Sequence, residues 1–241
     1  MTDHDDENPY KRKGFNFGAV LFVVLFLAAT VIGLTSSRGG GDEVATPAAT
    51  SSPAAAPQVA ASDKSVCGLP GYEETGTLTE APATTWTFVG SMAAPGSEQA
   101  GPGAIGNDGV RSCYAHTVDG AVTAVANIWA MGSDARLARL SLEKMTAPGA
   151  GRDAAIAANI PPANTGLSVQ IVGVKVLSYD GRDATVDVAF RSSTGQLLSF
   201  PAPVTWAEGD WKSVLTDDGQ PPLRPVALQS LGGYIPWEAA Q

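Results

Sequence analysis

The pattern of apolar and polar residues divides the chain into segments of different character. Residues 15–34 are almost entirely apolar and carry no charge. After Thr117 apolar residues first recur at the spacing of α-helices, and from Leu167 to Leu215 they alternate with polar residues as in β-strands. The pattern predicts one membrane-crossing helix near the start and, after a spacer, a folded domain with helices and strands.

The apolar run has the length of a transmembrane helix, since about 20 residues cross a bilayer core. The basic residues 11–13 lie directly before the run, and only Arg38 follows it closely. The positive-inside rule keeps such a basic flank in the cytoplasm. We therefore expect a cytoplasmic tip at residues 1–14, a single transmembrane helix at residues 15–35 with the lipid bilayer as its partner, and an extracytoplasmic remainder.

A cleaved signal peptide is the alternative interpretation of this run. Signal peptides have a shorter apolar core, typically about 7–15 residues, and end at small residues in an A-x-A-like site. Here the run is longer, the sequence Thr-Ser-Ser-Arg after Leu34 offers no such site, and no cysteine follows for a lipid anchor. A retained anchor in the cell membrane is therefore favoured.

Two segments with little periodicity follow. Residues 36–64 consist mainly of Ala, Pro, Ser, Thr and Gly without an aromatic residue, a composition typical of a disordered linker. Residues 65–116 are rich in turn-forming residues, and Thr85–Val89 is the stretch with the composition of a strand. Because such a long irregular segment needs something to hold it, we expect a disulfide and the packing of Trp86 to attach it to the domain.

Residues 117–241 carry the patterns of an α+β domain. Val122, Val125 and Trp129 form the apolar stripe of its first helix. Three helices are predicted: one capped by Thr117 that ends near Gly132, one capped by Ser133 or Asp134 that stops before Pro148, and a weaker one at Arg152–Asn159.

Four strands are predicted after the helices: from Leu167, from Ala184, at Gln196–Trp206 and at Asp210–Leu215. A shift of the alternation at residues 172–173 indicates a β-bulge, and Asp180-Gly181 indicates a hairpin turn. Pro201 and Pro203 predict an edge or irregular strand. The expected fold is helices packed on an antiparallel meander. The tail after residue 217 is expected to pack back onto the domain, with docking to a partner as the alternative.

Charge and cysteine usage narrow the possible functions. The formal net charge is −9, which argues against the clustered basic face that nucleic acids or anionic lipid surfaces require. Cys67 and Cys113 both follow the anchor, and exported cysteines usually pair. A disulfide is therefore favoured over a metal site, which lacks further ligands at suitable spacing, and over a catalytic thiol.

Catalytic patterns are missing from the predicted exported part. His116 is its single histidine, and none of the candidate nucleophiles Ser97, Ser112 and Ser141 lies in a G-x-S-x-G sequence. The acidic candidates Glu73, Glu74, Asp183 and Asp187 are expected in turns or on a solvated face. We expect His116 to be structural and the protein to be no enzyme, without a catalytic residue, metal or cofactor. Four tryptophans are expected in the core, with an aromatic-lined pocket as the alternative: Trp129, Trp206, Trp211 and Trp237.

Several short motifs together resemble a family of uncharacterised actinobacterial single-pass membrane proteins with an exported domain of unknown function. They are Cys67-Gly68-Leu69, Trp86 with Val89-Gly90, Pro95 with Ser97, Gly101-Pro102, and His116-Thr117 with Gly120-Ala121 and Asn127. The His-Thr-x-x-Gly-Ala run is the most specific of them. The resemblance implies no activity and no catalytic residue.

The order of anchor, tether, helices and meander is similar to that of cystatin-like, nuclear-transport-factor-like cones in the envelope scaffold subunits of conjugation and type IV secretion systems. This similarity concerns architecture, which does not fix function. It implies a non-enzymatic envelope protein that binds other proteins, with no nucleic-acid partner. The alternatives are a domain that binds a cell-wall fragment or lipid in a sheet pocket and, more remotely, a hydrolase centred on His116.

Overall fold

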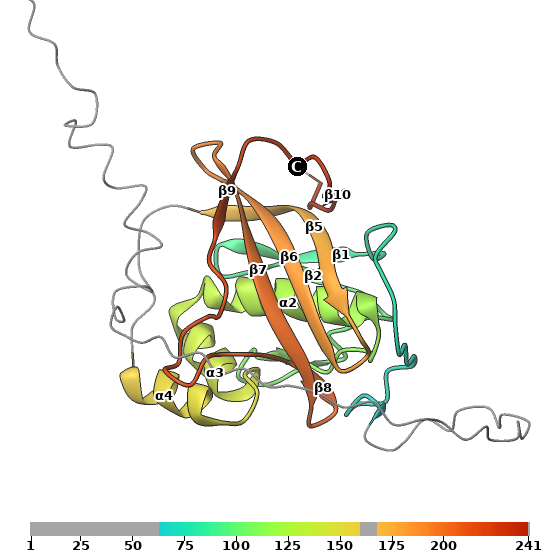
Figure 1. The fold of residues 1–241 in the computed structure, drawn as a ribbon, viewed down its shortest axis with the longest axis vertical. Helices are drawn as coiled ribbons and strands as arrows, with labels where there is room; N and C mark the ends of the chain where they lie inside the picture. The colour runs from blue at the N-terminus through green and yellow to red at the C-terminus, as the bar shows by residue number, and fades with distance from the viewer. Residues whose placement is uncertain (1–62, 160–167, 241) are drawn as a thin grey trace, which may run out of the picture.

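The computed structural model describes residues 63–159 and 168–240, and these form an α+β domain (Figure 1). Three helices are described: α2 (Val118–Gly132), α3 (Ala135–Lys144) and α4 (Ala150–Ala158). The strands of the largest sheet are β5 (Val169–Tyr179), β6 (Asp183–Ser192), β7 (Leu197–Ala207), β8 (Asp210–Ser213), β9 (Val226–Leu228) and β10 (Ile235–Pro236). Two small hairpins precede α2: β1 (Thr85–Val89) with β2 (Met92–Gly96), and β3 (Ala104–Ile105) with β4 (Arg111–Ser112).

The predicted antiparallel meander is confirmed. Strands β5, β6, β7 and β8 are neighbours in sequence order, β10 adds to the outer side of β5, and β9 pairs with β7. The pairing of β5 with β6 shifts between Ile171 and Gly173, where the sequence predicts the bulge. A second shift, between Val176 and Ser178, has no signal in the sequence.

The strand predicted to be an edge or irregular strand lies inside the sheet, so the edge alternative is wrong for β7, whereas its outer pairing is interrupted at the two prolines. β7 pairs with β6 along almost its whole length, and on its other side β9 covers residues 197–199 and β8 covers residues 204–207. Between these two strands the outer side of β7 faces no described strand. Pro201 and Pro203 lie in this gap, and their nitrogens point to the open side, because the Pro203 carbonyl on that side accepts the Val214 N–H at 3.0 Å.

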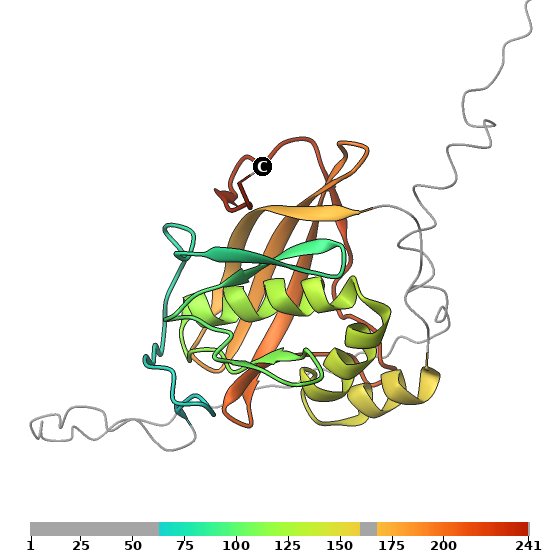
Figure 2. The ribbon, with the colours of Figure 1, turned by 180° about the vertical axis from the view of Figure 1, so that it is seen from behind.

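Helix α2 covers one face of the sheet (Figure 2). Its N-cap is Thr117 as predicted, whose side chain accepts the Gly120 N–H. Val122 and Val125 are fully buried, and they meet the inward side chains of the meander in a core that contains Val186, Val188, Phe200 and Trp211. Burial of this apolar stripe fixes the helix on the sheet.

The other two helices begin and end close to the predicted positions. Asp134 caps α3 by accepting the N–H groups of Arg136 and Leu137. The predicted weak helix at Arg152–Asn159 corresponds to α4, which begins two residues earlier, after Gly149. The tail packs back as expected, since Trp237 is buried against Trp86 and donates its indole N–H to Thr84 at 2.9 Å.

The N-terminal predictions lie outside the described residues. These are the cytoplasmic tip at 1–14, the transmembrane helix at 15–35 and all but the last two residues of the linker at 36–64. Within the ranges 63–159 and 168–240, no helix is both long and apolar enough to span a bilayer.

Candidate apolar binding groove

An open groove of about 300 Å³ lies where α2 and α3 meet the gap in β7. Its walls come from both helices, from the middle of β7 and from the chain after β8. The side chains that define it are Ile128, Trp129, Leu142, Pro201, Pro203 and Pro222. Its size is at the lower end of the range for small-ligand sites, about 300–1,000 Å³.

The two prolines of β7 explain why the groove exists. A residue with a backbone N–H at these positions could continue the ladder between β9 and β8, but proline has no such donor. The outer side of β7 therefore stays unpaired over residues 200–202, before the Pro203 carbonyl binds the Val214 N–H. The helices α2 and α3 then form the opposite wall of the open space.

Trp129 connects the groove to the core. Its ring packs at 4.5 Å from the ring of Phe200 and at 5.5 Å from that of Phe190, measured between centroids. It is only half-buried, so part of the indole remains in the groove. Of the four tryptophans expected in the core, Trp211 and Trp237 are buried there, whereas Trp129 has both roles.

The lining of the groove is chemically neutral. It contains no Asp, Glu, Lys, Arg or His. Among its hydroxyl groups, Thr146 and Ser213 are hydrogen-bonded to each other at 3.1 Å, and Ser213 also donates to the Met145 carbonyl at 3.2 Å. The groove can therefore take up apolar groups but has no acid or base for catalysis.

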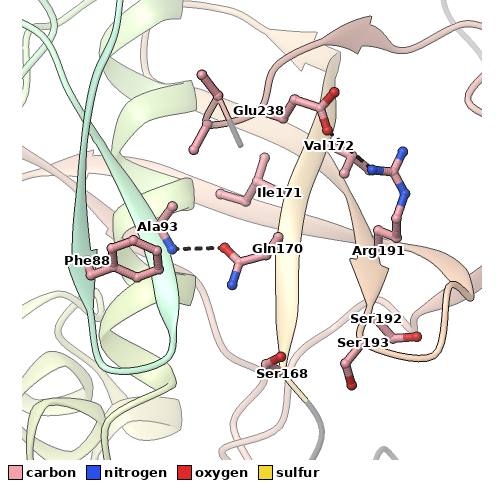
Figure 3. Close-up of a pocket in the computed structure, with 12 residues that line it drawn as sticks. Phe88, Ala93, Ser168, Gln170, Ile171, Val172, Arg191, Ser192, Ser193 and Glu238 are labelled. Carbon is pink, nitrogen blue, oxygen red and sulfur yellow. Dashed lines mark hydrogen bonds and ion pairs between the residues drawn. The ribbon is translucent and has the colours of Figure 1, made fainter.

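A second cavity, of about 290 Å³, opens between the β1–β2 hairpin and β5 (Figure 3). Gln170 lies on its floor and joins the two elements: its side-chain oxygen accepts the Ala93 N–H at 3.0 Å, and its amide nitrogen donates to the Ser91 carbonyl at 2.9 Å. At the rim Arg191 and Glu238 form an exposed ion pair at 3.3 Å. Because its polar groups already bind one another, this cavity offers less to a ligand than the groove does.

The predicted cysteine partners lie together. Cys67 and Cys113 are at disulfide distance, with their Cα atoms 6.0 Å apart. Asp210 holds this region on the sheet, because its carboxylate accepts the N–H groups of Cys113 at 2.8 Å and Tyr114 at 2.9 Å. Burial raises the pKa of Asp210 above its usual value, against the opposing effect of these hydrogen bonds and of Lys212. Asp210 is not among the site residues predicted from the sequence, where it is only the first residue of the strand expected at Asp210–Leu215.

His116 is buried and held on all sides. Its Nδ1 lies 2.9 Å from the carbonyl oxygen of Asp63, and its Nε2 is hydrogen-bonded to the carbonyl of Gly181. The ring stacks on Trp206 with centroids 3.8 Å apart. Both nitrogens thus bind backbone, which supports a structural role over that of a catalytic base.

The other residues of the His-Thr-x-x-Gly-Ala run also have structural roles. Thr117 caps α2, and Ala121 is buried in the core. A Cβ atom added to Gly120 would collide with the carbonyl oxygen of Ala115, so this position requires glycine. The most specific motif in the sequence therefore serves the fold.

One of the four acidic candidates departs from the expected solvated position. Asp187 is buried, because Tyr234 from the C-terminal tail lies over it and donates its hydroxyl at 2.6 Å. Burial and the contact with Asp187 raise the pKa of Tyr234 to about 12. Glu73 and Glu74 are exposed, as is Asp183, and Glu73 accepts the first N–H of α2. No cluster of three metal-binding side chains occurs in the described part of the chain.

Comparison with known proteins identifies a family but no function. Neither a curated protein nor a solved structure matches the chain significantly. A family profile, in contrast, matches residues 45–236, well over half of the sequence. The chain therefore belongs to the family described as Domain of unknown function (DUF8175).

Proposed function

We propose that this chain is a membrane-anchored, extracytoplasmic binding module, without enzymatic activity, that docks a protein partner of the cell envelope in the groove beside Trp129. The groove's neutral, apolar lining is the observation that carries this proposal. Apolar side chains of a partner gain free energy when they leave water, at about 25 cal/mol per Å² of buried surface.

The solid core beneath the groove favours docking at the surface. Phe200 and Trp211 are 2% and 0% exposed, so the protein interior under the groove is filled. A partner would insert one or two side chains and would make its remaining contacts on the rim. This is the arrangement of an interaction hot spot, in which a small apolar centre provides most of the binding energy.

The proposed compartment rests on the N-terminal sequence. The apolar run at residues 15–34 with its basic flank supports an anchor with a cytoplasmic N-terminus. The pair of Cys67 and Cys113 at disulfide distance supports an oxidising compartment for the domain. The helix that lies across an antiparallel meander also supports, at the level of architecture, a cystatin-like scaffold subunit of a conjugation or secretion apparatus.

A second candidate is the binding of a lipid or cell-wall fragment through its apolar part. The groove's volume of about 300 Å³ favours this candidate, because it is large enough for a small ligand. In that case the tether would hold the groove near the lipid source.

Site-specific photocrosslinking distinguishes these possibilities. A photoreactive amino acid replaces Leu142 in the full-length chain, and irradiation is performed on intact cells of its source organism. The matched control carries the same group at Leu177, an exposed leucine on β5 outside the groove. A discrete protein adduct from position 142, absent from position 177, supports docking of a partner protein, and a lipid adduct supports the second candidate. Equal labelling from both positions refutes both.

The anchor has a separate test. A retained helix keeps the full-length chain in the membrane after carbonate extraction, and protease added to intact cells digests the domain where the envelope lets it enter. A mature form that begins shortly after Leu34 would contradict the anchor, and a domain that stays protected in opened cell envelopes would contradict the topology.

A further inference from the structure

The strand β1 has a free edge. Figure 3 shows β2 between β1 and β5. β1 pairs with β2 alone among the described strands, whereas β2 also packs against α2 and β5. The edge of β1 that faces away from β2 therefore has no partner strand within the ranges 63–159 and 168–240.

The register of the hairpin shows which backbone groups lie on this edge. A two-residue turn links Val89 to Met92, and Phe88 lies opposite Ala93. The N–H of Ala93 points away from β1, to Gln170. Residues 88 and 93 are thus a pair without mutual hydrogen bonds, and by alternation so are 86 and 95. The N–H and C=O groups of Trp86 and Phe88 therefore point outward, and no described residue binds them.

The side chains around this edge are unusual for the surface of an acidic protein. Phe88 is 78% exposed. The hairpin from Thr85 to Gly96 contains no charged residue, although the chain has a net charge of −9. An uncharged, exposed strand of Thr, Trp, Thr, Phe and Val is a strong template for pairing with another strand.

We propose that β1 pairs with β1 of a second copy of this chain, antiparallel and around a two-fold axis at Thr87. In this register Trp86 lies opposite Phe88 of the second copy, and Thr87 lies opposite Thr87. The N–H and C=O groups of Trp86 then bind those of Phe88 in the second copy, and the groups of Phe88 bind those of Trp86 there. All four outward groups of each strand are thus hydrogen-bonded. Each exposed Phe88 gains an aromatic neighbour, and such cross-strand pairs contribute about 0.2–1 kcal/mol each.

A second copy fits this edge because β1 can pair with itself: in the antiparallel register around Thr87, each aromatic residue of one strand lies opposite an aromatic residue of the other. Moving the register by two residues in one direction leaves the outward groups of Phe88 opposite Thr84, outside the strand, and in the other direction it places Trp86 opposite Gly90 in the turn. Two chains of −9 repel each other over most of their surfaces, so a contact between copies needs a surface with little charge. The uncharged hairpin is a surface on which they can approach closely.

The first test is the mass of the full-length chain in detergent, by sedimentation equilibrium. We expect a dimer that the change Phe88→Lys converts to a monomer, because a lysine on the edge opposes strand pairing. The matched control Ile105→Lys, at another exposed apolar position (60% exposed), keeps the dimer. Thermal unfolding of Phe88→Lys at the wild-type midpoint shows that the fold is unchanged. A monomeric wild type, or the same mass for both variants, overturns the proposal.

The second test reads the register and does not depend on Phe88. In the proposed pair the two Thr87 Cα atoms are about 4.5 Å apart, within the range for a disulfide, so Thr87→Cys gives a covalent dimer under mild oxidation. The two Thr85 Cα atoms are at least about 13 Å apart, so Thr85→Cys does not. Equal crosslinking of both variants, or an adduct of Thr87→Cys with a different protein in its place, overturns pairing with a second copy.

Discussion

From Thr117 to Ser213 the fold is held by apolar side chains at regular spacing, whereas from Asp63 to His116 scattered apolar side chains such as Met92 and Tyr114 are supplemented by polar contacts with distant residues. In the first region α2 and the meander bury one face each. In the second, the N–H groups of Cys113 and Ala93 bind Asp210 and Gln170, which lie 97 and 77 residues further along the chain. The first kind of support has a period in the sequence, and the second has none.

The largest effect is expected at Trp211, which lies in the first region and contacts the second. Its side chain is fully buried in the core, and its indole N–H donates to the carbonyl of Ala115 at 2.9 Å. Trp211→Ala should lower the free energy of unfolding by about 5 kcal/mol, from the cavity and the lost hydrogen bond. Urea denaturation measures this. Trp211→Phe keeps most of the side-chain volume and should lower the free energy of unfolding much less. Equal losses for the two variants would contradict the role of the buried Trp211 side chain in filling the core.

Removal of the disulfide should destabilise the second region more than the first. Replacing Cys67 and Cys113 by alanine should cost about 4 kcal/mol, the loop-closure value for a sequence separation of 46. Hydrogen exchange should show lost protection in residues 63–116 and retained protection in β6 and β7. Equal loss in both regions would show that they unfold as one unit and that their stabilities do not differ.

Asp210 tests the polar support of the second region directly, because it binds the N–H groups of Cys113 and Tyr114. Asp210→Asn places an amide where a carboxylate oxygen accepts backbone N–H groups, so a cost of about 1–3 kcal/mol is expected. Asp183→Asn, on the exposed side of the same sheet, should change stability by less than about 0.5 kcal/mol. A loss that is no larger for Asp210 than for Asp183 would contradict the role of Asp210.

The pH dependence of Asp210 has a definite sign. Because burial raises its pKa in the folded state above that of the unfolded chain, the folded state binds the proton more tightly. Its contribution to stability is therefore fully present below the unfolded pKa, about 4, and decreases as the pH rises through the folded pKa. The stability of the wild type relative to Asp210→Asn should fall over this range in urea titrations, and a rise would refute the assigned direction.

The smallest effect is expected at Gln170. Gln170→Ala removes two hydrogen bonds between β5 and the β1–β2 hairpin and should cost about 1 kcal/mol. The exchange rate of the Ala93 amide should rise most. Gln196→Ala, at an exposed turn, serves as the control, and an unchanged Ala93 amide would contradict the bridge.

The difference between local or periodic signals and contacts with distant residues also decides what the sequence could predict. The caps Thr117 and Asp134, the bulge near Gly173 and the turn at Asp180-Gly181 depend on neighbours within a few residues, and each is where the sequence placed it. Strand β2 was missed, because its sequence Met-Ala-Ala-Pro-Gly resembles a turn. It becomes a strand through its position between β1, α2 and β5.

The groove was predictable in its parts but not as a site. Trp129 and the two prolines of β7 stood out in the sequence as an aromatic that could line a pocket and as breaks in a strand. Their meeting depends on β9, which comes from the tail and stops at residue 199 of β7. Since β9 consists of three apolar residues without alternation, no local signal shows where the sheet is left open.

Gln170 also limits how far the chain can assemble. By binding Ala93 and Ser91 it occupies the side of the β1–β2 hairpin that faces β5. The hairpin therefore presents a single edge for strand addition, the outer edge of β1. A two-fold contact between two copies occupies that edge in both of them. Growth through this hairpin ends at two molecules, where a ribbon open on both sides would continue into a fibre.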